Sequence, residues 1–127
     1  MDVEPFAELF ARRRAAWLAA DVDGYLDLFS PDLIIELPGR RIDGRESYER
    51  LVRASFARSR PVEFTFDAIA VAAPDVVMAD WTISVERRDT GAIVSWRGMS
   101  VCRVVDGRIT RWREYYEDPA ALAVAMT

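Results

Sequence analysis

Glu114 is the side chain of this sequence best suited to proton chemistry, because aromatic residues surround it. It belongs to the segment Arg111-Trp112-Arg113-Glu114-Tyr115-Tyr116. A carboxylate held among tryptophan rings takes up a proton more readily than one in water, which is the condition for a general base near neutral pH. We therefore hypothesise that Glu114 is a general base. The alternative is a structural carboxylate paired with an arginine.

Two further charged residues could assist Glu114. Glu36 lies in an apolar strand segment, and we expect it to point inward, where two carboxylates in one pocket would supply an acid and a base. Pointing outward, it would be an ordinary surface glutamate. Arg13 interrupts the apolar stripe of a helix, and an inward guanidinium would need a carboxylate or an anionic ligand. The alternative for Arg13 is a side chain that extends past the helix edge to solvent.

The residue types that are absent exclude much familiar chemistry. The 127 residues include no His, and all 17 basic residues are arginine, so the chain has no Lys; it also lacks Asn and Gln. These absences exclude an imidazole base, a His-ligated metal, a Schiff base and a P-loop lysine. The single Cys102 cannot close an intrachain disulfide, which is typical of a reducing compartment. We expect neither a cofactor nor a bound metal.

The charge balance argues against several classes of partner. Acidic residues outnumber basic ones by 21 to 17, which gives a net charge of -4 and a pI near 4.9, whereas a nucleic-acid-binding domain normally has a basic excess. No stretch approaches the roughly 18 apolar residues of a membrane span, and the acidic start lacks the pattern of a signal peptide. We expect a cytoplasmic protein that binds neither nucleic acid nor membrane.

Helical spacing dominates the first half of the chain, and alternation dominates the second. Helices are predicted over residues 5–20 and 22–29 and from Asp43 to about residue 56, with a short strand at 33–37. Residues 62–66 alternate as a strand does, long strands are predicted over 76–88, 93–105 and 108–118, and a last short helix is predicted from Asp118 to Ala125. We predict a single α+β domain over residues 1–127, in which three N-terminal helices cover a curved antiparallel sheet.

The register of the last hairpins decides which side chains share the covered face. If residues 105–107 form a three-residue loop, Gly98 lies opposite Glu114 and leaves room for a small molecule. A two-residue turn at Asp106-Gly107 would instead turn Glu114 outward. With the longer loop, the covered face holds Trp81, Ile83, Val85, Trp96, Gly98, Ser100, Cys102, Trp112, Glu114 and Tyr116. The opposite face includes Met99, Val101, Arg111, Arg113 and Tyr115.

Several segments together follow one family pattern. They are residues 20–29, Glu36-Leu37-Pro38, Gly44-Arg45-Glu46 and residues 105–116. With them the chain resembles the nuclear transport factor 2-like superfamily, especially its SnoaL-like and limonene-epoxide-hydrolase-like branches, over nearly its whole length. The resemblance implies a cystatin-like cone, in which a strongly bent sheet is closed by helices around a deep pocket, and a dimer formed through the convex sheet face.

The known activities of this superfamily carry over only in part. Arg13 and Leu37 stand where the ketosteroid isomerases have a tyrosine and an aspartate. Trp81 and Ile83 stand where the epoxide hydrolases have an arginine and an aspartate on the long strand. Glu114 matches the aspartate of the epoxide hydrolase motif Trp-Arg-Asp-Tyr, with one more methylene. The resemblance therefore leaves Glu114 as the one essential acid that is retained.

These residues predict a cofactor-independent enzyme of the isomerase, cyclase or epoxide hydrolase type, which acts on a small apolar molecule by carboxylate acid/base chemistry. The alternative is a non-catalytic dimeric module that binds a hydrophobic small molecule. We expect the catalytic residues to be Glu114, Glu36 and Arg13. The expected substrate-binding residues are Trp17, Trp81, Ile83, Ser100, Trp112 and Tyr116. A homodimer is expected through Met99, Val101, Arg111, Arg113 and Tyr115.

Overall fold

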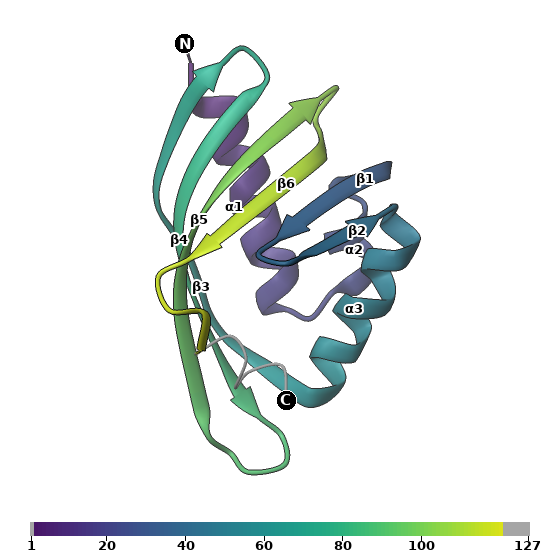
Figure 1. Ribbon diagram of the computed structural model, residues 1–127, viewed down its shortest axis with the longest axis vertical. Helices are drawn as coiled ribbons and strands as arrows, with labels where there is room; N and C mark the ends of the chain where they lie inside the picture. Colours follow the sequence, from purple (N-terminus) through teal and green to yellow (C-terminus); the bar gives the residue numbers. More distant parts are fainter. Residues whose placement is uncertain (1, 121–127) are drawn as a thin grey trace.

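The computed structural model describes residues 2–120, in which helices lie against one six-stranded sheet (Figure 1). The helices are α1 (Glu4–Leu18), α2 (Val22–Leu26) and α3 (Arg45–Arg58). The strands are β1 (Phe29–Leu37), β2 (Arg40–Asp43), β3 (Ser59–Ala73), β4 (Val76–Arg87), β5 (Ile93–Val105) and β6 (Arg108–Tyr116). Their order across the sheet is β2-β1-β6-β5-β4-β3.

The predicted α+β architecture is confirmed, with one correction to the sheet. The long strands β3 to β6 form an antiparallel meander, and α1 packs against β3 while α3 packs against β1 (Figure 1). The strand β1, however, pairs with β6 in parallel, so the sheet is mixed rather than wholly antiparallel. The short strand β2 was not predicted; it forms because the chain turns back after β1 and pairs with it.

The helix boundaries differ from the predicted ones at the ends. α2 starts as predicted, where the Asp21 carboxylate accepts a hydrogen bond from the Gly24 backbone N–H at 3.1 Å, but it ends at Leu26 because the chain enters β1 at Phe29. α3 follows Gly44, whose positive φ of 90° lets the chain turn from β2 into the helix. The expected helix from Asp118 to Ala125 lies largely outside the described residues.

A two-residue turn and a β-bulge set the register of β6, instead of the three-residue loop that we expected. Asp106 and Gly107 both have left-handed backbone angles, with φ of 51° and 76°, as a tight hairpin turn requires. Val104 then pairs with Ile109 but Arg103 pairs with Arg111, which leaves Thr110 as the extra residue of a bulge. The turn alone would point Glu114 outward, and the bulge turns it back toward the helices.

The predicted assignment of side chains to the covered face is therefore right, although the predicted partners are shifted by two residues. Ser100 lies opposite Glu114, and Gly98 lies between Trp81 and Tyr116. A Cβ atom on Gly98 would come within 2.6 Å of the Trp81 ring. The space above Gly98 is thus filled by an indole ring, and it does not accommodate a small molecule as we expected.

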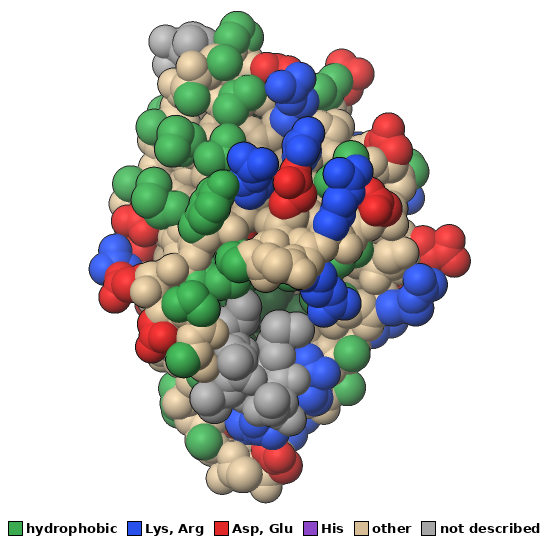
Figure 2. All heavy atoms as spheres, viewed as in Figure 1, with side chains coloured by type: hydrophobic (Ala, Val, Ile, Leu, Met, Phe, Trp, Pro, Cys, Tyr) green, Lys and Arg blue, Asp and Glu red, His purple; other side chains and the backbone are tan. Residues whose placement is uncertain are grey.

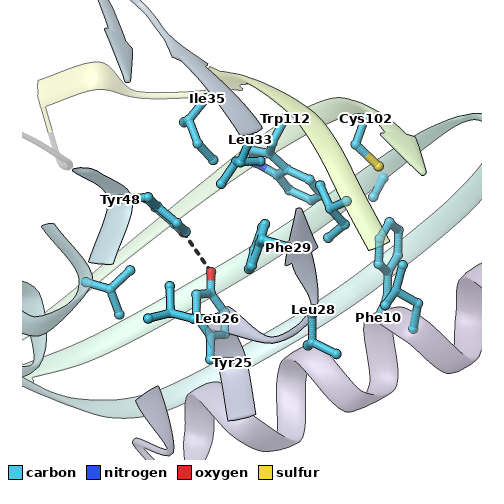
Figure 3. Close-up of a cluster of buried hydrophobic side chains, with 14 of the residues drawn as sticks. Phe10, Tyr25, Leu26, Leu28, Phe29, Leu33, Ile35, Tyr48, Cys102 and Trp112 are labelled. Atoms are coloured by element: carbon cyan, nitrogen blue, oxygen red, sulfur yellow. Dashed lines mark hydrogen bonds between the residues drawn. The ribbon is translucent and has the colours of Figure 1, made fainter. Parts of the chain in front are cut away.

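The helices and the sheet enclose an aromatic core (Figure 3). Phe10 of α1 and Trp112 of β6 are both buried and meet edge to face, with ring centroids 6.0 Å apart. Cys102 lies in the same core, and burial raises the pKa of its thiol to about 12. Cys102 is therefore a small buried apolar side chain, as its sequence context indicated.

Candidate active site

A cavity of about 130 Å³ lies between the helices and the concave face of the sheet. It can hold several water molecules, because a single one needs roughly 10–15 Å³ of such space. Its wall is mostly apolar and aromatic, and its charged residues are few. The lining residues are Arg13, Trp17, Tyr25, Ile35, Leu37, Ile42, Tyr48, Leu51, Ser55, Arg58, Ser59, Phe64, Trp81, Ile83, Val85, Trp96, Glu114 and Tyr116.

Among residues 2–120, Glu114 is the one carboxylate on the wall of this cavity. Its Oε1 accepts a hydrogen bond from the Trp112 indole N–H at 2.7 Å, and its Oε2 accepts one from the Tyr116 hydroxyl at 2.6 Å. All three side chains project from the same face of β6, because residues two apart in a strand share a face. Within residues 2–120, no arginine forms an ion pair with Glu114, so the arginine pairing that a structural role implied is not observed.

In the hydrogen bond between Tyr116 and Glu114, the Tyr116 hydroxyl is the donor. Burial raises the pKa of its phenol well above the usual range, and the neighbouring Glu114 carboxylate raises it further. Tyr116 therefore stays protonated at any physiological pH, and its O–H holds the Glu114 carboxylate in position.

Arg13 points inward, as one of the two sequence readings predicted. Only 3% of it is exposed, and its guanidinium carbon lies 3.8 Å from the centre of the Trp112 ring. Its Nη2 donates to the Tyr25 hydroxyl at 3.0 Å, and that oxygen lies 2.8 Å from the Tyr48 hydroxyl (Figure 3). In the described part of the chain Arg13 forms no ion pair. Of the two partners expected for an inward Arg13, a carboxylate of the chain is therefore not observed, and an anionic ligand stays a prediction.

Arg13 keeps its positive charge in this apolar setting. Burial lowers the pKa of the guanidinium, but the Tyr25 and Tyr48 hydroxyls and the Glu114 carboxylate raise it, and the net shift is upward. The aromatic faces around the guanidinium also stabilise the cation. The cavity thus contains a permanent positive charge on the helix side and a carboxylate on the sheet side.

The expectation that Glu36 points into the cavity is wrong. In β1 the alternation buries Leu33 and Ile35, which are 0% and 2% exposed, and so turns Glu36 to the other face of the sheet. There its carboxylate is held by Arg111 and Arg113 of the neighbouring strand β6. These guanidinium groups lower the pKa of Glu36, chiefly through the hydrogen bond from Arg111. Glu36 is therefore paired on the outer face and cannot share the cavity with Glu114.

The other predicted binding residues divide between the cavity wall and the layer behind it. Trp17, Trp81, Ile83 and Tyr116 line the cavity. Trp112 and Ser100 do not line it; both are buried behind the wall, with 1% of each residue exposed. Trp112 supports Arg13 and Glu114 from behind, and the Ser100 hydroxyl accepts a hydrogen bond from the Trp81 indole N–H at 2.8 Å. Ser100 thus fixes a wall residue rather than a ligand.

Five polar residues of the wall were not among the predicted site residues: Tyr25, Tyr48, Ser55, Arg58 and Ser59. Tyr48 belongs to the apolar stripe of α3, and Arg58 continues that stripe at helical spacing, so the periodicity held a signal for both. Tyr25 lies in the short helix α2. Its position opposite Tyr48 depends on how α2 and α3 pack, which no local pattern predicts.

The outer face of the sheet presents the residues expected there. Met99 and Tyr115 are 47% and 53% exposed, and Val101 lies beside them on β5. Figure 2 shows hydrophobic side chains along the side where β4 and β5 run, with basic and acidic side chains interspersed over β6 and β1. This face is therefore apolar on one side and charged on the other.

The described residues contain neither a metal-binding cluster nor a membrane-spanning helix. Between residues 2 and 120, no three side chains of the His, Cys, Asp and Glu types come together as a metal site. No helix of this part of the chain is long and apolar enough to cross a membrane.

Several solved structures share this fold. A Bacillus subtilis protein provisionally named an isomerase has a TM-score of 0.85 and 23% identity, over 98% of this chain and 95% of its own. An epoxide hydrolase of M. tuberculosis, described as LEH-like, has a TM-score of 0.77 and 25% identity, over 94% of this chain and 86% of its own. A protein of Xanthomonas campestris provisionally named a polyketide cyclase has a TM-score of 0.77 and 20% identity, over 98% of both chains.

The sequence comparisons give one family. No curated protein matches the chain. The pattern of the SnoaL-like domain matches residues 4–112, which include the three helices and β6 as far as Trp112. This match and the structural neighbours confirm the resemblance to the nuclear transport factor 2-like superfamily. The chain is a member of the SnoaL-like domain family.

Proposed function

We propose that this protein is a cofactor-independent enzyme that acts on a small, largely apolar molecule by proton transfer at Glu114. One observation carries the proposal: the Glu114 carboxylate lies on an aromatic cavity, and its described partners are the neutral donors Trp112 and Tyr116. A carboxylate that no arginine neutralises remains available to accept a proton from a substrate.

The neighbours of Glu114 have distinct roles in this proposal. Trp112 and Tyr116 each bind one carboxylate oxygen and so fix its orientation, and each oxygen keeps lone pairs for a substrate proton. Arg13 places a positive charge in the same cavity, which stabilises negative charge that develops on a substrate oxygen. The aromatic wall binds the apolar body of the substrate and limits access of water.

The cavity wall limits which residues can take part in the reaction. Leu37, Trp81 and Ile83 stand at positions where relatives of known activity have polar catalytic residues, and all three line the cavity as apolar side chains. The chemistry then depends on one carboxylate and one guanidinium. Isomerisation, cyclisation and addition of water to an epoxide each need no more than proton transfer and charge stabilisation, and all three remain within the proposal.

The experiment compares two glutamine variants in two reactions. The probes are α-proton exchange of 2-indanone in D₂O, followed by NMR, and hydrolysis of styrene oxide. The wild-type protein should accelerate at least one of them. Glu114→Gln should reduce that rate by about 10²–10⁴-fold, the usual contribution of a general base, while retaining the fold by circular dichroism.

Glu36→Gln is the matched control, because it makes the same chemical change on the outer face of the neighbouring strand. It should keep the wild-type rate. Equal activity of the Glu114→Gln variant and the wild type would overturn the proposal. Acceleration of neither reaction by the wild type would favour the alternative, a non-catalytic module that binds a hydrophobic molecule.

We also propose that the molecule forms a homodimer through the outer sheet face. The exposed side chains of Met99 and Tyr115 and the neighbouring Val101 supply an apolar centre. Arg111 and Arg113 lie at its edge, and a polar rim around an apolar centre is typical of protein interfaces. This assembly would leave the cavity, on the opposite face, open to substrate.

A further inference from the structure

Arg13 has more hydrogen-bond donors than the described chain satisfies. Its Nε and Nη1 atoms are buried without a hydrogen-bond partner within residues 2–120, and only Nη2 is engaged, by Tyr25. A buried donor that lacks a partner costs about 1–3 kcal/mol, and more when the group is charged. Other atoms of Arg13 line the cavity, so a rotation of the guanidinium would present these donors to a molecule in the cavity.

The two tyrosines beside Arg13 add a further donor. Arg13 can only donate, so the Tyr25 oxygen accepts its hydrogen bond. The two hydroxyl groups then share one hydrogen bond between them, which uses one of their two protons. The other proton has no acceptor among the hydrogen bonds of the described residues. Among the described residues, Arg13 and the two tyrosines thus offer several hydrogen-bond donors to the cavity. Their only acceptors are the lone pairs of the two hydroxyl groups.

A second guanidinium reaches the cavity from the end of α3. Arg58 lines it, and its buried Nε also lacks a hydrogen-bond partner in the part of the chain that the structure describes. Of the described residues, the charged ones on the wall are therefore Arg13, Arg58 and Glu114, two cations and one anion. These three give the wall a net positive charge although the protein as a whole has a net charge of -4.

We infer that the molecule bound in this cavity carries a carboxylate group, which Arg13 binds through Nε or Nη1 together with the second N–H of Nη2. A planar carboxylate accepts two parallel N–H bonds from a guanidinium, and its charge balances the excess of cations. The rest of the molecule is apolar and aromatic in character, to match the wall. This inference rests on the proposed function, since it names the substrate class of the same site.

The test uses two probes of the same shape and different charge. Binding of trans-cinnamate and of trans-cinnamamide to the wild-type protein is measured by isothermal titration calorimetry at pH 7. The carboxylate should bind at least about 10-fold more tightly than the amide, because only the carboxylate is charged and accepts at both oxygens. Equal binding of the two probes, tighter binding of the amide, or binding of neither would overturn the inference.

Two variants assign this preference to a residue. Arg13→Met retains the length of the side chain and should reduce cinnamate binding to the level of the amide. Arg58→Met, at the half-buried end of α3, should weaken cinnamate binding less. The comparison of the two probes on the wild-type protein needs no variant, so it holds even where Arg13→Met does not fold. A folded Arg13→Met variant that still prefers cinnamate by 10-fold would contradict the assignment.

The Glu114→Gln variant distinguishes the proposed function from the binding inference. It should lose turnover of the probe substrates, yet it should keep or increase the preference for cinnamate, because a negative charge leaves the cavity. If the variant retains turnover but the wild type prefers cinnamate, the proposed function fails and the binding inference stands. If the variant loses turnover and the wild type shows no preference for cinnamate, the binding inference fails and the proposed function stands.

Discussion

Glu36 and Glu114 show how the same side chain can have two different environments on neighbouring strands. Glu114 lies on the covered face of β6 and binds neutral donors from Trp112 and Tyr116. Glu36 lies on the outer face of β1, paired with Arg113 across the parallel ladder. The only geometric difference is the side of the sheet, and it determines whether a carboxylate is available for proton transfer or is held by guanidinium groups.

The ion pairs of Glu36 predict how the stability of the folded protein changes with pH. Its pKa is lowered in the folded protein, chiefly by the hydrogen bond from Arg111, so the pairing adds stability above the pKa of the unfolded chain and this contribution disappears as the pH falls through the folded pKa. Urea unfolding should show the wild type more stable than Glu36→Gln at pH 7, with a smaller difference at pH 3. A difference that stays constant with pH would show that the ion pairs contribute nothing.

At the scale of elements, the end of the β5–β6 hairpin controls the site. The turn at Asp106-Gly107 fixes the start of β6, and the bulge at Thr110 shifts its alternation by one residue. Ile109 and Trp112 both point inward because of that shift, and both are buried. Glu114 follows two residues later on the same face. The turn and the bulge at the end of this hairpin therefore decide which side chains of β6 face the cavity.

The turn can be tested by changing its backbone preference. Gly107 has a φ of 76°, and an added Cβ would meet no atom within 4 Å, so any cost of substitution comes from the backbone alone. Gly107→Val should lower the free energy of unfolding by about 1–2 kcal/mol, the cost of a left-handed L-residue. Asp106→Asn, the matched control, should stay within about 0.5 kcal/mol of the wild type. Equal stability of both variants in urea unfolding would contradict this explanation of the turn.

At the scale of the whole molecule, the curved sheet has two faces with different uses. Its concave face and the helices enclose the cavity, and its convex face presents Met99 and Tyr115 to the surroundings. Among the described residues, three charged side chains line the cavity, whereas charged side chains are frequent on the convex face. In the function and the dimer proposed above, the same strands shape a binding site on one face and provide a surface for assembly on the other.

The proposed dimer gives a prediction at this scale. Met99→Arg would place a positive charge in the apolar centre of the outer face, on the same face as Arg111 and Arg113, and the two copies would repel each other. Light scattering should give twice the mass of one chain for the wild type and the mass of one chain for the variant. A wild-type protein with the mass of one chain would sink the proposal.

The sequence predicted the composition of the covered face because strand alternation is a local property. Trp81, Trp112 and Glu114 were assigned inward from their spacing and from the aromatic residues around them, and the structure confirms this placement even though the pairing partners differ. The errors concern features that alternation does not encode. The bulge at Thr110 has no apolar signature, and Gly98 accommodates the Trp81 ring rather than a ligand.

The sequence by itself determined the family fold, the absence of imidazole and lysine chemistry, and the choice of Glu114 as the acid to consider. Only the tertiary structure decided that Glu36 is excluded from the cavity and that Tyr25, Tyr48 and Arg58 belong to it. The physical reason is that alternation along the chain determines only which side chains share a face. Which face is covered, and which partners a side chain meets, follow from the packing of elements that are distant in sequence, such as α2 on α3 and β1 on β6.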